Sequence, residues 1–362
     1  MNHKNTTEPL RAALIGYGLG GAAFHAPFLA ALPEYELGAV VTGNPERAAA
    51  VHGRYGDEVE VIPAATELFA RGDEFDVAVV TVPNRFHAAL ARESLAAGLH
   101  VVVDKPFAGT AEEGRALAAL AEAQGRTLCV FQNRRWDGDF RTLRDLVERG
   151  QLGDVRRFES RFERWRPEPA LGAWKEDPDP AALGGILYDL GSHLIDQAVA
   201  LFGRPLRVYA ELDRSRPGVE VDDDSFVALT HAQGVRSHLW MSATAADLGP
   251  RLRVLGSKAA FVKYGLDVQE AALRTGGVPG SDGWGDEQED GWGLLGTPGD
   301  GRTVPTLAGA YQDFYREFAA AVHGDGPVPV PVAESVTVLE VIEAAQRSSR
   351  EGAVVTLADP DA

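Results

Sequence analysis

A lysine stands directly after a short apolar stretch in residues 100–106, HVVVDKP. Lysine is scarce in this chain, which has 5 lysines against 30 arginines. Burial can tune the pKa of a lysine, whereas an arginine stays charged. If the apolar stretch is a parallel strand, Lys105 lies at the sheet edge where open α/β sheets bind ligands. There it could hydrogen-bond a hydroxyl group and help to move its proton; the alternative is an exposed salt bridge in a loop.

A histidine and two carboxylates recur at helical spacing within residues 184–196, GGILYDLGSHLID. Asp189 and His193 are four residues apart and would share one face of a helix, with Asp196 three residues further on. A carboxylate beside an imidazole raises its pKa and orients the ring, which would give a general acid/base pair near neutral pH. The alternative is a satisfied histidine near a helix N-terminus.

Residues 16–21, GYGLGG, fit the pattern G-x-G-x-x-G between a predicted strand and a predicted helix. Such glycines allow a tight turn, close approach of the backbone to a pyrophosphate, and close packing of helix on strand. The helix N-terminus then offers unpaired N–H groups to the phosphates. We therefore expect a dinucleotide cofactor rather than a plain glycine turn, with contacts from Gly16, Gly18, Leu19 and Gly21.

The end of the next predicted strand bears on which dinucleotide binds. A site for NAD usually has a carboxylate there, about 20 residues past the glycines, to hold the ribose hydroxyls. Residues 42–47 are TGNPER, with no carboxylate at the strand tip. Thr42, Asn44 and Arg47 could instead hold a 2′-phosphate, with Arg47 donating charge-assisted hydrogen bonds. This favours NADP, with NAD left open; the alternative is a solvated Arg47, with Glu46 interacting with the helix dipole.

The elements that must position these residues alternate between strands and helices over the first 130 residues. Apolar, β-branched stretches predict buried parallel strands, and the amphipathic stretches between them predict helices. Such alternation is typical of right-handed βαβ units and a parallel sheet. The predicted strands are 11–16, 35–41, 59–62, 75–82, 100–103 and 128–131, and the predicted helices are 18–32, 44–53, 64–71, 84–97 and 110–124.

The second part of the chain has a different pattern. Strand-like runs follow one another without helices between them, which is typical of an antiparallel sheet: 206–212, 225–230, 236–242, 251–255 and 259–264, after a first run at 155–164. Residues 181–202 predict one long helix with Gly184 and Gly185 in its first turns, residues 276–302 a loop rich in glycine and acids, and residues 307–322 and 332–350 two more helices. We therefore expect two domains, 1–130 and 131–362.

Composition excludes several classes of protein. The 362 residues are 45% hydrophobic and 24% charged, as in an ordinary folded protein of about two domains. A formal net charge of -18 without a basic patch argues against a nucleic-acid partner. No apolar run is long enough to span a membrane, residues 1–8 show no secretory signal, and the single cysteine, Cys129, is expected in the core. The sequence predicts a cytoplasmic protein without a metal site, the acids of residues 276–302 being a solvated surface.

Three of these motifs together resemble the Gfo/Idh/MocA oxidoreductases: the glycine loop, residues 104–106 (DKP) and residues 184–196. The third follows the family pattern G-G-x-x-x-D-x-G-x-H-x-x-D without mismatch, whereas Asp104 stands where the family has glutamate. The NADP-dependent scyllo-inositol dehydrogenase branch of the family is similar at residues 24–27, 133–137, 188–193 and 263–265, although it commonly has Ser-Arg where this chain has Gly43-Asn44. The resemblance covers nearly the whole chain.

The resemblance implies an N-terminal Rossmann domain, a doubly wound parallel sheet, and a C-terminal α+β domain with a large, mainly antiparallel open sheet. Its open face would join subunits of a homodimer or homotetramer. The implied activity is reversible hydride transfer between a nicotinamide cofactor and a secondary alcohol of a polyol or sugar, with an inositol-like substrate favoured.

The same resemblance implies roles for individual residues. His193 would be the general base, Lys105 would hydrogen-bond the reacting oxygen, and Asp189 would bind a neighbouring hydroxyl. Further cofactor contacts are expected from His25, Val82, Pro83, Asn84, His87, Asp104, Lys105 and Asn133. The substrate pocket is expected to include Trp136, with Arg164, Trp174 and Tyr264 as further candidates against a core or surface role.

Two rival functions stay open at this point. The same fold could hold NAD tightly and act on glycosides or on two sugars in turn, which cofactor retention and glycoside cleavage would reveal. The chain could also be a non-catalytic dinucleotide sensor, although intact Lys105, Asp189 and His193 argue against it.

Overall fold

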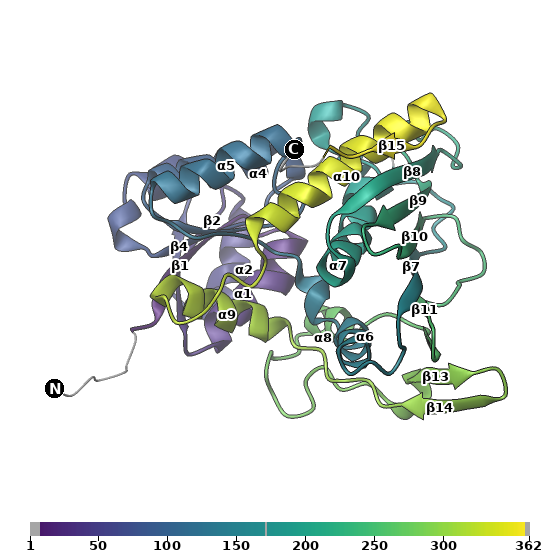
Figure 1. Ribbon diagram of the computed structural model, residues 1–362. Coiled ribbons are helices and arrows are strands. Elements are labelled where there is room, and N and C mark those ends of the chain that lie inside the picture. The colour runs from purple at the N-terminus through teal and green to yellow at the C-terminus, as the bar shows by residue number, and fades with distance from the viewer. Residues whose placement is uncertain (1–7, 171, 359–362) are drawn as a thin grey trace.

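The computed structural model describes residues 8–170 and 172–358, which fold around two sheets (Figure 1). The first is a six-stranded parallel sheet in the order β3-β2-β1-β4-β5-β6, so the predicted Rossmann fold is confirmed. Its strands are β1 (Leu10–Ile15), β2 (Tyr35–Val41), β3 (Glu60–Ile62), β4 (Val77–Val80), β5 (His100–Val103) and β6 (Leu128–Val130). Its helices are α1 (Ala26–Ala31), α2 (Pro45–Tyr55), α3 (Ala65–Phe69), α4 (His87–Ala96) and α5 (Ala111–Ala123).

Both faces of the first sheet are buried, which explains its continuous apolar strands. Successive residues of β1 point to opposite faces: Ala12 and Leu14 join one hydrophobic cluster, while Ala13 and Ile15 join another. Cys129 on β6 is fully buried, and burial raises the pKa of its thiol to about 12. It is therefore a core residue, as predicted.

The second sheet has nine strands in the order β14-β13-β12-β11-β7-β10-β9-β8-β15. Its neighbours pair antiparallel except β7 and β10, which are parallel. The strands are β7 (Val155–Glu163), β8 (Pro205–Asp213), β9 (Asp224–His231), β10 (Arg236–Ser242), β11 (Leu252–Gly256), β12 (Ala260–Lys263), β13 (Gly293–Thr297), β14 (Asp300–Val304) and β15 (Val355–Thr356). The predicted mixed fold, mainly antiparallel in its second half, is confirmed.

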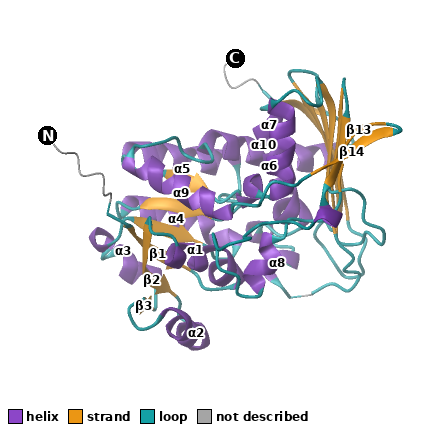
Figure 2. Ribbon diagram, turned by 90° about the horizontal axis from the view of Figure 1, so that it is seen from below, coloured by secondary structure: helices purple, strands orange, loops and turns teal. Residues whose placement is uncertain are grey.

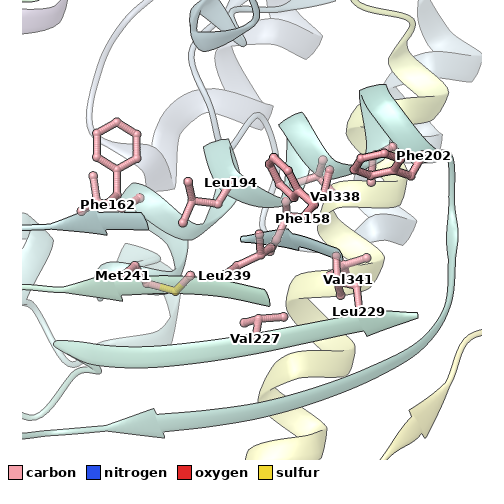
Figure 3. Close-up of a cluster of buried hydrophobic side chains, with 14 of the residues drawn as sticks. Phe158, Phe162, Leu194, Phe202, Val227, Leu229, Leu239, Met241, Val338 and Val341 are labelled. Atoms are coloured by element: carbon pink, nitrogen blue, oxygen red, sulfur yellow. The ribbon is translucent and has the colours of Figure 1, made fainter. Parts of the chain in front are cut away.

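One face of the second sheet packs on helices that lie between the two sheets (Figure 2). These helices are α6 (Gly138–Glu148), α7 (Ser192–Phe202) and α10 (Val332–Glu351). Phe158 and Phe162 of β7 meet Leu194 of α7 and Val338 of α10 in the core of this part (Figure 3). Burial alternates along most of β10, as expected for a strand covered on one side, whereas β7 has a buried run at residues 158–160.

The predicted helix over residues 181–202 is wrong at its start. Leu183 has a φ of 52° and Gly185 a φ of 93°, so regular helix begins only later, with a π-helical stretch at Leu187–Gly191 before α7. A Cβ on Gly185 would lie 2.1 Å from Asp222 Oδ1, which leaves room there for glycine alone. The Asp222 carboxylate accepts the backbone N–H of Leu187 at 2.7 Å and so starts the helical run from outside it.

The predicted loop over residues 276–302 is wrong at its end, since it contains β13 and most of β14. These strands form an edge hairpin around Pro298-Gly299, with Gly299 at a φ of 83°. The alternation typical of a strand, with Leu295 buried and Leu294 exposed, was not recognised among the surrounding glycines and acids. The prediction also missed α6, β15 and a short helix, α8 (Gln269–Arg274).

Two helices near the end of the chain return to the first sheet. Helix α9 (Tyr311–His323) places Phe314, Tyr315 and Phe318 in the cluster that covers one face of β1. Helix α10 contacts α5 of the first part as well as α7 and β8 of the second. The boundary at residues 130/131 stays a prediction. No helix in the described ranges is long and apolar enough to cross a bilayer.

Candidate active site

The glycine loop follows β1 at the carboxyl edge of the parallel sheet. Gly16 has a φ of 103°, and a Cβ there would lie 2.2 Å from the carbonyl oxygen of Thr81. A Cβ on Gly21 would lie 2.3 Å from the carbonyl oxygen of Gly16, whereas one on Gly18 would meet nothing within 4 Å. Gly16 thus makes the turn, Gly21 the close packing, and Gly18 leaves open space into which a pyrophosphate would fit. Leu19 beside it is 58% exposed.

The end of β2 carries the three polar residues considered for a 2′-phosphate. Asn44 caps α2, accepting the backbone N–H of Arg47 at 3.0 Å, and the backbone N–H of Asn44 donates to Thr42 Oγ1 at 3.3 Å. The Arg47 side chain is exposed and makes no ion pair with any described residue. Its guanidinium is therefore available to an anion at this edge.

Asp104, at the end of β5, is held by a histidine and not by its neighbour Lys105. Its Oδ1 lies 3.2 Å from His25 Nε2, and His25 Nδ1 lies 2.5 Å from the hydroxyl of Tyr315. Burial alone would raise the pKa of Asp104, but the His25 ring, by charge and hydrogen bond, keeps it at about 2. His25 is fully buried beneath this carboxylate, which makes it a support for Asp104 rather than a face of the cofactor cleft.

The residues after β4 mainly hold the sheet edge together. His87, 1% exposed, places its two ring nitrogens 2.7 Å from the carbonyl oxygens of Val82 and Pro106. Asn84 donates its amide to the carbonyl oxygen of Leu183 at 3.0 Å, across to the second half of the chain. Pro83 lies between Val82 and Asn84 in the sequence. Asn133, in the segment after β6, is 6% exposed. His87 is thus placed to position the ends of β4 and β5.

Lys105 reaches from the first sheet to the π-helical stretch of the second half, where it meets Asp189. Its Nζ donates to the backbone carbonyl oxygen of Asp189 and lies 3.4 Å from Asp189 Oδ1. Lys175 approaches the same Oδ1 at 2.7 Å. Burial would raise the pKa of Asp189, but Lys105 and then Lys175 hold it well below its usual range. Burial also lowers the pKa of Lys105.

His193 lies one turn further on, 7% exposed, near the ring of Phe162. Its Nδ1 is buried without a hydrogen-bond partner, and its ring makes no hydrogen bond to any residue that the structure describes. Burial, with Lys105 as the next cause, lowers the pKa of His193 well below its usual range. The site therefore holds a neutral imidazole beside a cationic lysine.

The expectation that a carboxylate raises the pKa of His193 is wrong. The Asp189 carboxylate is held by two lysines, and the Asp196 carboxylate is held by Arg135 at 2.6 and 2.8 Å. Sequence spacing could place the carboxylates near the ring, but it could not show that both form ion pairs with cations from other segments.

Other residues considered for the substrate pocket fall in different places. Trp136 is 6% exposed in the core against Phe314, with its indole N–H donating to Glu317 at 3.3 Å, so we drop it as a substrate contact. Tyr264 is 60% exposed on the surface. Arg164 lines a cavity that Asp189 also lines. Lys175 was missed, and its only sequence signal was the scarcity of lysine in this chain.

Comparisons with known proteins agree with this geometry. Residues 10–132 match a family model described as an oxidoreductase family with an NAD-binding Rossmann fold. Residues 144–357 match the model of that family's C-terminal alpha/beta domain. The chain is 39% identical to the Escherichia coli protein "Uncharacterized oxidoreductase YdgJ", over 97% of this chain and 100% of that one.

Similarity to Bacillus subtilis sequences and structures also extends over nearly the full length. The chain is 34% identical to scyllo-inositol 2-dehydrogenase (NADP(+)) IolW, over 98% of each chain. A solved structure, that of the oxidoreductase YvaA, has 33% identity over 98% of this chain and 100% of that one, and a TM-score of 0.90.

Proposed function

Because the chain belongs to the Gfo/Idh/MocA oxidoreductase family, we propose that it is an NADP-dependent dehydrogenase acting on a secondary alcohol of a polyol or sugar. The observation that carries this proposal is the meeting of Lys105 with Asp189, one turn before His193. Three groups able to bind and deprotonate a hydroxyl thus gather where the edge of the nucleotide-binding sheet touches the second domain.

The chain's own residues handle the proton. His193 is neutral and its ring has no hydrogen bond to a described residue, so it can accept the proton of the reacting hydroxyl. Lys105 donates to the same oxygen and stabilises the charge that develops on it as the C–O double bond forms. Asp189 accepts a hydrogen bond from a neighbouring hydroxyl. A bound nicotinamide would take the hydride that leaves the carbon.

The protein groups around the glycine loop fit a dinucleotide. Gly18 offers backbone with open space above it, and Asp104 is a carboxylate kept ionised at the end of β5. Support for NADP comes from Arg47, which is exposed and free of any described carboxylate, and from the name of the relative IolW. NAD is the weaker candidate.

A panel of polyols and aldoses, followed at the nicotinamide absorbance with NAD and with NADP, tests the proposal. We expect NADP-dependent oxidation of at least one inositol or sugar. Arg47→Gln should weaken NADP binding about tenfold, one charge-assisted hydrogen bond, and leave NAD binding unchanged. Absence of any turnover with either cofactor would overturn the proposed activity. A cytoplasmic location and assembly as a homodimer or homotetramer also stay proposals.

A further inference from the structure

A small cavity of about 100 Å³ adjoins Asp189 on the side of the second domain. Four of its lining side chains are cationic and three are acidic: Arg164, Arg166, Lys175 and Arg216 against Glu176, Asp189 and Asp222. The cavity thus has a cationic excess in a chain whose formal net charge is -18. An excess of this kind needs an explanation, because elsewhere acids outnumber bases.

Each of the three acids already has partners. Asp189 is held by the two lysines described above. Glu176 lies 3.0 Å from Arg216, which also pairs with Asp223. Asp222 accepts the backbone N–H of Leu187 and the hydroxyl of Ser225. Asp222 thus has neutral donors only, and Glu176 keeps one buried oxygen without a hydrogen bond, so the four cations still exceed the three acids by one.

Arg164 and Arg166 are the two lining cations that make no ion pair with a described residue, although the Asp189 carboxylate acts on Arg164 through space. In the ranges that the structure describes, neither guanidinium makes a hydrogen bond or an ion pair. Arg164 is half-buried, and burial lowers its pKa, so its charge is partly withdrawn from water. A guanidinium in that setting favours an anion that can accept its fork of N–H donors.

The backbone fixes the direction in which these two side chains leave the chain. The segment extends β7: the N–H of Arg164 donates to the carbonyl oxygen of Ser242 at 2.8 Å, and that of Arg166 donates to Ala243 at 2.7 Å. Residues two apart on an extended segment point to the same side, so both arginines face the cavity, while Trp165 between them is 58% exposed. The backbone of the pair is therefore set before any ligand arrives, with the Arg164 side chain half-buried and that of Arg166 exposed.

We infer that the substrate is an anionic sugar or polyol, whose carboxylate or phosphate is bound by Arg164 and Arg166 while one of its hydroxyls meets Lys105, Asp189 and His193. This rests on the proposed function. The local charge also answers a physical need, because a strongly acidic protein repels anions unless cations stand at the site. A neutral polyol would leave both guanidinium groups without a partner.

The test compares three sugars that share one ring and differ at C6: glucose, glucuronate and glucose 6-phosphate. Dissociation constants are measured by calorimetry on the enzyme saturated with NADPH, and kcat/KM is measured with NADP. We expect at least one charged sugar to bind about tenfold more tightly than glucose, with the difference shrinking at high salt. Tighter binding of glucuronate would identify a carboxylate as the bound anion, and tighter binding of glucose 6-phosphate would identify a phosphate.

Arg164→Gln should lower the charged-to-neutral affinity ratio about tenfold, the size of one hydrogen bond to a charged group. Arg92→Gln, which removes an exposed arginine on α4, is the matched control and should leave the ratio unchanged. Equal binding of glucose and both charged sugars, or an unchanged ratio in Arg164→Gln, would overturn the inference. Tight binding of a charged sugar, with no turnover of that sugar or of any member of the polyol and aldose panel, would instead reject the proposed activity and keep the anion site.

Discussion

Replacing Lys105 by methionine should abolish most turnover while leaving the fold and the cofactor site intact. Methionine keeps the length of the side chain but removes the ammonium group that meets Asp189. The Asp189 carboxylate keeps Lys175 at 2.7 Å, so the change does not strand a buried charge. The expected loss of folding free energy is about 1–2 kcal/mol, the value of the lost hydrogen bond, and not the roughly 3–5 kcal/mol of a broken buried pair.

The expected loss of catalysis is larger. Removing a group that stabilises the developing oxyanion and helps to move its proton typically costs about 10²–10⁴-fold, or about 3–5 kcal/mol of activation free energy. Lys105 is also the main charge that depresses the pKa of His193. The variant should therefore move the acidic limb of its rate–pH profile to higher pH, because the His193 pKa rises toward its usual value.

Three measurements on Lys105→Met separate these effects. Steady-state kinetics over a range of pH give the turnover and the acidic limb, calorimetry gives the NADP affinity, and urea unfolding gives the stability. Turnover within about threefold of the wild type would refute the role given to Lys105. Loss of NADP binding equal to the loss of turnover would show that Lys105 holds the cofactor instead.

Three further predictions concern the loop, a buried pair and the histidine. Gly18→Val should lower dinucleotide affinity at least about tenfold with an unchanged melting temperature. Gly16→Ala should lower the free energy of unfolding by about 1–3 kcal/mol through backbone strain alone. Equal losses of stability in the two variants would contradict this. Arg135→Met should lower the urea unfolding free energy by about 3–5 kcal/mol because it leaves Asp196 buried without that cation, and a loss below about 1 kcal/mol would argue against the pair. The pKa of His193 is depressed in the folded state, so below about pH 6.5 the unfolded chain binds a proton that the folded chain does not. The free energy of unfolding therefore decreases as the pH is lowered. The stability of His193→Gln should therefore fall less than that of the wild type between about pH 7.5 and about pH 5 in urea titrations, and parallel curves would contradict a buried neutral ring.

Local pattern was enough to predict most of the first half. Each parallel strand there is an apolar run bounded by turn residues. The spacing of the glycines in residues 16–21 is sufficient to predict the tight turn between the first strand and the first helix. Strand β2 and strand β5 lie at the residues predicted for them. The second half was harder because the helix is broken at Leu183 and Gly185, and Gly185 lies against Asp222, a residue far along the chain.

The candidate site shows the same division between local and distant information. Lys105, Asp189 and His193 were identified from motifs, and the structure brings Lys105 to Asp189. Which charges face each other could not be predicted, because Lys175 and Arg135 reach the carboxylates from separate segments. The pKa of His193 moved opposite to expectation because burial, and then the charge of Lys105, lowers it.

The position of the last two helices in the sequence limits how early in synthesis the first half of the chain can complete its core. The cluster on one face of the parallel sheet includes Phe314 and Val330, and the cluster on the other face includes Val336 and Leu339. Helices of the first half cover part of each face, but a ribosome must deliver nearly the entire polypeptide before the two clusters are complete. Until then part of the apolar surface on each face stays uncovered, although that half of the chain is translated first.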